Sequence, residues 1–271
     1  MTDIPEWYLD DKIPTYRAVP SSDDVLDAFH RVGAVRLLDA VPENYASAFY
    51  REALRLFHQP QAIKDRLKRT GLGSGFTPAG VEGVRGGLPN PHRSFLDLRA
   101  DLSDVRRLEE EFPLNMFLAS KVLRQIQDLA MDVLNVGWPD VANLAEGGEH
   151  MFRITHYPSG HAGKELFPSH RDFGLITCYL GGAERGLKFY HGSGFWDHVR
   201  NDVGSIVVTA GTTLCQYDRD CIAIQHAAYG YLDERISAVL FTEPRGDVVL
   251  PNGKTAREHL THLTSQIRKD P

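Results

Sequence analysis

The side chains with the clearest chemical potential lie in the second half of the chain. His170 and Asp172 are separated by one residue, so on an extended strand both side chains would point to the same side. A ring nitrogen beside a carboxylate oxygen suits a divalent metal ion, and two histidines with one carboxylate on one face of ferrous iron are a known arrangement. A third ligand must come from another strand, and His226, which lies within an apolar stretch, is the candidate.

A second group of side chains could bind an anion. Arg235 and Ser237 would share one face of a strand that is otherwise apolar through Thr242. An arginine fork with a neighbouring hydroxyl can hold a carboxylate, and an apolar strand should not carry a buried arginine without an anion. Considered alone, His226 could instead be a hydrogen-bonded histidine of the core, and Arg235 could instead belong to a structural ion pair. Their spacing after His170 and Asp172 favours one combined site.

Short apolar segments after Gly147 must position these residues. They are evenly spaced and separated by glycine, aspartate and asparagine turns, which is typical of a β-sandwich or β-barrel. The sequence predicts strands over 151–157, 175–180, 187–191, 194–198, 205–208, 222–229 and 236–242.

The first half of the chain is helical in pattern. Apolar residues recur at helical spacing, and the sequence predicts helices over 21–32 and 42–57. A third helix, which contains Ile63 and Leu67, is expected to continue to about 69, and a fourth is expected over 104–135 with a break at Pro113. Between them, residues 71–94 are rich in glycine and proline and predict a long irregular loop, followed by a strand over 94–98. A final helix is expected over 254–267.

Composition limits the partners. The net charge is −6 with no basic block, which argues against nucleic acid as the main partner. The three cysteines fit no zinc spacing and are expected to be small buried apolar residues. The N-terminal residues have no signal-peptide pattern, and no stretch reaches transmembrane length. We therefore expect a cytoplasmic protein, a monomer, that acts on a small molecule and does not bind membranes.

The order H-x-D, then H-x₈-R-x-S, resembles the isopenicillin N synthase-type family of Fe(II)- and 2-oxoglutarate-dependent dioxygenases. The resemblance extends to residues 153–158, which end in Tyr-Pro, and to residues 174–177 and 185–189. Residues 29–87 resemble the N-terminal region of that family, so the similarity covers about 23–245.

This resemblance implies a mainly β fold with flanking helices, whose core is a double-stranded β-helix (a distorted jelly roll). A single domain would span 1–271, with an N-terminal helical region over about 21–135, the catalytic core over about 150–245 and a C-terminal helix over 252–271. His170, Asp172 and His226 would bind Fe(II), and Arg235, Ser237 and Tyr157 would hold the far carboxylate of 2-oxoglutarate. With O2, 2-oxoglutarate would give succinate and CO2 while a C–H bond of a polar small molecule is hydroxylated, in bacterial secondary metabolism.

Some positions depart from the family pattern and leave the substrate open. Ala227 and Ala228 follow the distal histidine where Arg-Val is common, and Thr155 stands where many relatives have asparagine. Asp172 argues against a halogenase, because halogenating relatives have a small residue there. An oxidase or cyclase of the same fold that needs no 2-oxoglutarate, and a non-catalytic metal-binding barrel, remain alternatives. Candidate substrate contacts are Asn90, His92, Arg93, Ser94 and Arg171. Each of them could instead be a loop residue exposed to solvent.

Overall fold

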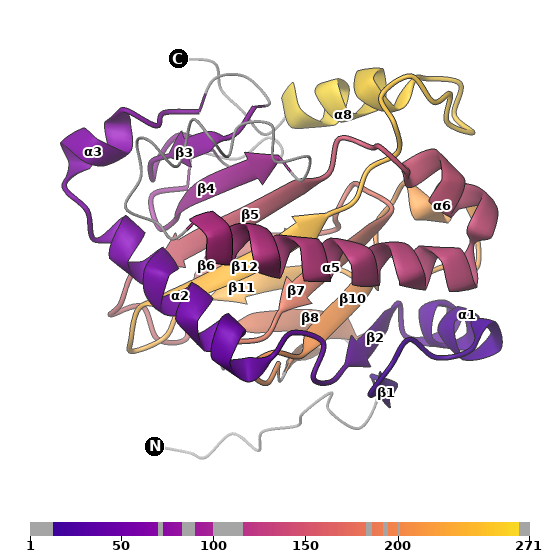
Figure 1. Ribbon diagram of the computed structural model, residues 1–271, viewed down its shortest axis with the longest axis horizontal. Helices are drawn as coiled ribbons and strands as arrows, with labels where there is room; N and C mark the ends of the chain where they lie inside the picture. Colours follow the sequence, from indigo (N-terminus) through magenta and orange to yellow (C-terminus); the bar gives the residue numbers. More distant parts are fainter. Residues whose placement is uncertain are drawn as a thin grey trace.

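Two β-sheets form the centre of the protein (Figure 1). The computed structural model describes residues 13–69, 73–82, 90–99, 116–182, 186–191, 195–199 and 201–265. The larger sheet has the order β1-β2-β10-β7-β12-β5-β4-β3, and the smaller sheet has the order β6-β11-β8-β9. The strands are β1 (Thr15–Tyr16), β2 (Ala34–Leu37), β3 (Gly75–Thr77), β4 (Ser94–Arg99), β5 (Met151–Tyr157), β6 (Glu165–His170), β7 (Ile176–Leu180), β8 (Leu187–His191), β9 (Phe195–His198), β10 (Ile206–Ala210), β11 (His226–Tyr229) and β12 (Arg235–Phe241).

Helices cover one face of the larger sheet, where α2 and α5 lie across the strands in Figure 1. The side-chain oxygen of Ser21 caps α1 by accepting a hydrogen bond from the Asp24 backbone N–H at 3.4 Å, and acidic residues fill its first turn. The helices are α1 (Ser22–Arg31), α2 (Glu43–Phe57), α3 (Gln61–Asp65), α5 (Met116–Gly137), α6 (Pro139–Ala145), α7 (Leu214–Tyr217) and α8 (Ala256–Ser265).

Alternation along the strands of the larger sheet separates two apolar layers. On β7, Cys178 and Leu180 pack with the helices, whereas Tyr179 packs on the opposite side with Phe189 of the smaller sheet. On β10, Val207 likewise points to the space between the sheets. Successive residues of a strand face opposite sides, so the same strands that anchor the helices also line the space between the two sheets. The predicted fold class, a β core with flanking helices consistent with a double-stranded β-helix, is confirmed.

The strands predicted after Gly147 are present with small shifts at their ends, except that only 226–229 of the predicted strand 222–229 is extended. The Ile222 N–H donates to the Phe29 carbonyl at the end of α1 instead of to a neighbouring strand. The prediction missed β1, β6, α6 and the short α7, and α3 ends at Asp65 rather than near Arg69. It also missed β3, which lies within the predicted irregular loop 71–94 and pairs with β4. Pro168 lies within β6 and lacks an N–H donor, which an edge strand such as β6 tolerates.

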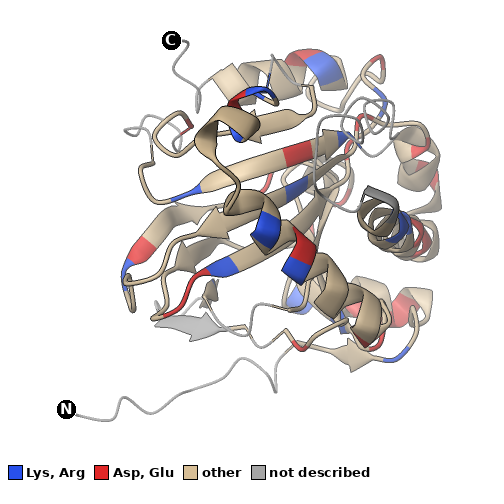
Figure 2. Ribbon diagram, turned by 60° about the vertical axis from the view of Figure 1, so that its left-hand side comes forward, with Lys and Arg blue, Asp and Glu red and all other residues tan. Residues whose placement is uncertain are grey.

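Part of the predicted helix over 104–135, including Pro113, lies outside the described residues, as do parts of the loop 71–94 and of the helix 254–267. Within the described residues, no helix is long and apolar enough to cross a membrane. Figure 2 shows basic and acidic segments close to one another on helices and strands in that view.

Candidate active site

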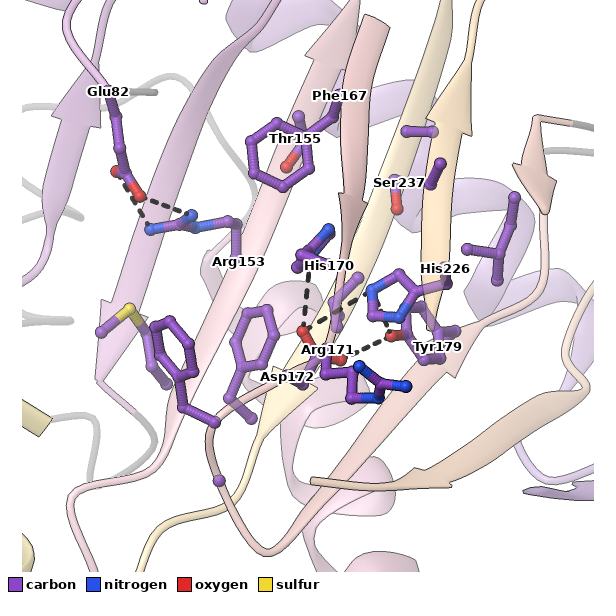
Figure 3. Close-up of a pocket in the computed structure, with 18 of the residues that line it drawn as sticks. Glu82, Arg153, Thr155, Phe167, His170, Arg171, Asp172, Tyr179, His226 and Ser237 are labelled. Carbon is purple, nitrogen blue, oxygen red and sulfur yellow. Dashed lines mark hydrogen bonds and ion pairs between the residues drawn. The ribbon is translucent and has the colours of Figure 1, made fainter. Parts of the chain in front are cut away.

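Three potential metal ligands meet between the sheets (Figure 3). His170 ends β6, His226 begins β11, and the two are direct cross-strand partners in the smaller sheet. Asp172 lies after the end of β6, so the expectation that it shares an extended strand with His170 is wrong. The chain leaves β6 toward β7 of the larger sheet, and this crossing brings the carboxylate to the two imidazoles. We call His170, Asp172 and His226 the pocket triad.

The ligating atoms of the pocket triad are close but do not bond to one another. Both Nε2 atoms lie 3.6 Å from the same carboxylate oxygen, Asp172 Oδ1, and the two ring centroids are 4.2 Å apart. A distance of 3.6 Å is too long for a hydrogen bond. The three atoms, all within 4.8 Å of one another, therefore surround a common point at which a metal ion could accept their lone pairs.

Backbone carbonyls orient both imidazoles. His170 Nδ1 is 3.0 Å from the Pro168 carbonyl, and His226 Nδ1 is 3.3 Å from the Ile224 carbonyl. A carbonyl oxygen can only accept, so each Nδ1 must carry the hydrogen. Each Nε2 is then left with a lone pair, as a metal-binding histidine requires. His170 Nε2 faces Asp172, and His226 Nε2 lies 3.6 Å from Asp172 Oδ1 and 3.1 Å from the Tyr179 hydroxyl.

Tyr179 orients the carboxylate, and sequence reasoning missed this role. Its hydroxyl donates to Asp172 Oδ2 at 2.6 Å, which leaves Oδ1 to face the histidines. Burial would raise the pKa of Asp172, but His226, His170 and the Tyr179 hydroxyl outweigh burial and lower it. A tyrosine within a buried strand needs a partner for its hydroxyl, and this requirement is the signal that could have identified Tyr179.

The protonation states suit a divalent metal. Burial, followed by the neighbouring His226, lowers the pKa of His170 to about 3, so this imidazole is neutral at physiological pH. Two imidazoles and one carboxylate are the donors of the facial arrangement that binds non-haem Fe(II) and leaves other positions open. The residues present therefore fit Fe(II).

The predicted anion clamp lies on the larger sheet. Arg235 of β12 is the cross-strand partner of Tyr157 of β5, and its guanidinium carbon lies 4.1 Å from the Tyr157 ring centroid. Arg235 Nε is buried without a hydrogen-bond partner among the described residues, and burial lowers the pKa of the guanidinium. A Cβ on Gly186, where φ is +116°, would come within 2.7 Å of Arg235 Nε, so glycine gives this guanidinium its space. An anion is the partner that Arg235 lacks.

One cavity of about 700 Å³ joins the two groups. The pocket triad, Arg235, Ser237 and Tyr157 all line it. Its apolar wall comes from both sheets and from α8, with Phe167, Leu187, Val199, Val239, Phe241 and Leu260 among the lining residues. The volume is typical of a small-molecule site.

The predicted substrate contacts separate into two groups. Arg93 and Arg171 line the cavity, and Arg171 is exposed with its Nε donating to the Ala223 carbonyl at 2.8 Å. Asn90, His92 and Ser94 do not line it. The Asn90 amide is occupied by the Leu166 carbonyl and by the His92 backbone N–H. Their roles in substrate binding stay predictions.

Solved structures of similar fold include complexes with 2-oxoglutarate. The dioxygenase for auxin oxidation 1 of Arabidopsis thaliana, in complex with 2-oxoglutarate, superposes with a TM-score of 0.75 at 19% identity, covering 87% of this chain and 94% of that one. A full-length Neurospora crassa protein in complex with alpha-KG gives 0.74 at 16% identity, covering 90% of each chain. A 2OG-Fe(II) oxygenase family protein of Caulobacter crescentus gives 0.72 at 21% identity, covering 91% and 94%.

A family model identifies the segment that carries the site. Residues 148–244 match the model described as the 2OG-Fe(II) oxygenase superfamily, and this segment contains the pocket triad and the residues of the anion clamp. The predicted enzyme class and cofactors are thereby confirmed at the level of the superfamily. This match and the pocket triad within it show an oxidoreductase of the dioxygenase class that uses Fe(II), 2-oxoglutarate and O2.

Proposed function

We infer that the protein hydroxylates a C–H bond of a small molecule. His170, Asp172 and His226 hold the iron, while Arg235, Ser237 and Tyr157 bind the far carboxylate of 2-oxoglutarate. Bound Fe(II) with 2-oxoglutarate and O2 supplies the oxidising power, and 2-oxoglutarate leaves as succinate and CO2. The observation that carries the proposal is the presence in one cavity of three ligating atoms that form no hydrogen bond to one another and one buried guanidinium with an unpaired nitrogen.

Each protein group has a defined task in this reaction. The carbonyls of Pro168 and Ile224 keep the imidazole lone pairs directed at the metal position. Tyr179 holds the carboxylate so that a single oxygen faces the metal. The apolar wall excludes water around the reacting C–H bond, which strengthens polar contacts and limits side reactions. Arg235 fixes the orientation of the co-substrate through a charge-assisted hydrogen bond.

The finer parts of the prediction belong to the same proposal. We place the chain near the isopenicillin N synthase-type enzymes because of the spacing from His226 to Arg235 and Ser237. A single domain over 1–271, a monomeric state, a cytoplasmic location and a role in bacterial secondary metabolism complete it. The match over 148–244 and the cavity volume support a small-molecule substrate.

Formation of succinate tests the reaction. Purified protein with Fe(II), 2-oxoglutarate and O2 should release succinate, and Asp172→Ala should abolish the release. Arg235→Gln should raise the 2-oxoglutarate concentration needed for half-maximal rate by about tenfold or more, since a charge-assisted hydrogen bond is lost. The matched control is Arg31→Gln, which removes one exposed guanidinium outside the cavity and should leave this concentration unchanged.

Three results would contradict the proposal or its assignment of residues. An oxidase that needs no 2-oxoglutarate would consume O2 without releasing succinate, and the clamp would then serve a carboxylate of another substrate. A non-catalytic barrel would bind iron but consume no O2 with any small molecule tested. An unchanged 2-oxoglutarate requirement in Arg235→Gln would show that the clamp is assigned to the wrong residue.

A further inference from the structure

A group of charged side chains, Arg69, Glu82, Arg93 and Arg153, lines the same cavity. Arg153 of β5 donates to Asp97 through Nε at 2.7 Å and Nη2 at 2.9 Å, and to Glu82 through Nη1 at 3.2 Å (Figure 3 shows the Glu82 contact). Arg69 also donates to Asp97. With Asp97, the described residues of this group contain three guanidinium groups and two carboxylates, so positive charge is in excess by one.

Arg93 is the member of this group with the weakest pairing. Its side chain is 5% exposed, yet Nε and Nη2 have no hydrogen-bond partner among the residues that the structure describes. The nearest carboxylate oxygen, Glu82 Oε1, is 3.8 Å from Nη2 and is already bonded to Arg153. Burial and the neighbouring Arg153 lower the pKa of Arg93 to about 10, so the group stays charged at neutral pH. A buried charge of this kind is unfavourable until an anion pairs with it.

Aromatic stacking holds Arg93 toward the metal end of the cavity. Its guanidinium carbon lies 3.6 Å from the centroid of the Phe167 ring. The Phe167 ring also contacts the pocket triad, since the Phe167 and His170 ring centroids are 4.6 Å apart. Both Arg93 and Phe167 line the cavity. An anion paired with Arg93 would therefore sit one aromatic ring away from the metal position.

2-Oxoglutarate does not account for Arg93. One of its carboxylates belongs with the keto group at the metal, and the other is matched by Arg235, which is itself unpaired at Nε among the described residues. Arg93 and Arg235 are both incompletely paired, but 2-oxoglutarate has only one carboxylate that is not at the metal, and Arg235 binds it. Arg93 remains for the substrate that is oxidised.

We propose that the substrate is an organic acid whose carboxylate binds Arg93 while an apolar body lies against Phe167, Val239 and Phe241 near the metal position. This inference rests on the proposed function, because it assigns the substrate of that site. The excess of one positive charge matches a monoanion, so a carboxylate fits better than a phosphate monoester. The guanidinium fork gives a carboxylate two parallel hydrogen bonds.

Binding of matched acid and amide pairs tests the proposal without turnover. The protein is loaded with Zn(II) in place of Fe(II), saturated with 2-oxoglutarate and titrated by calorimetry with 3-phenylpropanoate and 3-phenylpropanamide. Phenylacetate and hexanoate are titrated against their amides in the same way, and phenyl phosphate provides a dianion. At least one acid should bind about tenfold or more tightly than its amide, as expected for charge-assisted hydrogen bonds to a buried group. No preference for any of the acids, or a preference for phenyl phosphate, would overturn it.

Substitutions assign the preference to Arg93. Arg93→Met should reduce the ratio of acid to amide affinity to about one, and Arg31→Met, which removes an exposed guanidinium on α1, should keep the original ratio. Arg93→Met leaves Glu82 paired with Arg153, so its melting temperature should not fall. Arg93→Lys keeps the charge without the fork and should give an intermediate ratio, which tests the proposal even if the methionine variant does not fold. An unchanged ratio in Arg93→Lys and in any folded Arg93→Met would refute it.

Release of succinate without added substrate separates the two proposals. Arg93→Met should keep the wild-type 2-oxoglutarate requirement in that assay. A higher requirement would place Arg93 at the co-substrate and contradict the inference while leaving the proposed function intact. If the wild type released no succinate, the proposed function would fail, and an acid preference that depends on Arg93 would still show an organic-acid site.

Discussion

Among the described residues, two groups contain two histidines and one carboxylate with ligating atoms within 4.8 Å, and only one of these groups is built to hold a metal. The first is the pocket triad. The second, which we call the surface triad, consists of His58 at the end of α2, His156 of β5 and Glu234 just before β12. By residue type and proximity the two groups are equivalent.

They differ in what their lone pairs already bind. In the surface triad, Nε2 of His58 and Nε2 of His156 lie 2.9 and 2.8 Å from the same oxygen, Glu234 Oε2, so the three groups satisfy one another. In the pocket triad the corresponding distances are 3.6 Å. The His58 side chain is 54% exposed and that of Asp172 is 5% exposed. Ligand type and spacing therefore do not define a metal site; the ligating atoms must also be free of hydrogen bonds to one another.

Removal of the carboxylate should produce the largest contrast between the triads. Asp172→Ala should weaken Fe(II) binding at least about 100-fold, since loss of a ligand should exceed the effect of losing an outer partner. Glu234→Ala should leave Fe(II) affinity and stoichiometry unchanged. Anaerobic equilibrium dialysis measures both. Loss of a bound iron in Glu234→Ala would show that the surface triad also binds the metal.

Metal should stabilise the fold through one triad only. At a free Zn(II) concentration of about 100 times the dissociation constant, linkage predicts about 2.7 kcal/mol of stabilisation. The melting temperature should therefore rise by about 5 °C or more in the wild type. Differential scanning calorimetry with metal and with chelator tests this, and Asp172→Ala should show a rise of at most about 1 °C, because the same Zn(II) concentration would then be no more than about one dissociation constant. If Zn(II) raised the melting temperature of Asp172→Ala as much as that of the wild type, and further substitution of His58 removed this rise, the surface triad would be the metal site.

The hydroxyl that orients Asp172 should have an intermediate effect. Tyr179→Phe removes the 2.6 Å hydrogen bond to Oδ2 and should weaken Fe(II) binding by about tenfold. The matched control is Tyr50→Phe, which removes a buried hydroxyl bonded to the Leu180 carbonyl rather than to a ligand. Equal affinities for the two variants would show that Tyr179 is structural only.

The surface triad should have a small effect, confined to stability. Burial acts to raise the pKa of Glu234, but hydrogen bonds from His156 and His58 outweigh it and keep the pKa below its ordinary value of 4.5. Its contribution should be present above pH 4.5 and lost as the pH falls through the lowered value. Glu234→Gln should therefore reduce the free energy of unfolding by about 0.5 kcal/mol at neutral pH and less at pH 3. Urea unfolding at both pH values measures the difference.

Sequence patterns predicted β4, β5, β7, β10 and β12 of the larger sheet well, because these strands are rich in apolar residues and bounded by turns, but they missed β1 and β3. Arg235 and Ser237 indeed lie on one strand. The patterns failed for His170 and Asp172, where proximity comes from the chain crossing between sheets, and for β6, where Pro168 obscured an edge strand. The surface triad could not be predicted, since it depends on contacts between elements distant in sequence. For Tyr179 the only signal was that a tyrosine within a buried strand needs a partner for its hydroxyl.

The position of Arg93, immediately before β4, has an evolutionary consequence. The residues proposed to hold iron and 2-oxoglutarate all lie within 148–244, whereas Arg93 lies outside that segment, next to the strand that neighbours β5 in the larger sheet. Selection could therefore exchange the group that recognises the substrate while the oxidising centre stays intact. Directed evolution toward neutral or cationic substrates should begin at Arg93 and at Phe167, on which it stacks. Substitutions at these two positions change substrate recognition and keep the residues proposed to hold iron and 2-oxoglutarate.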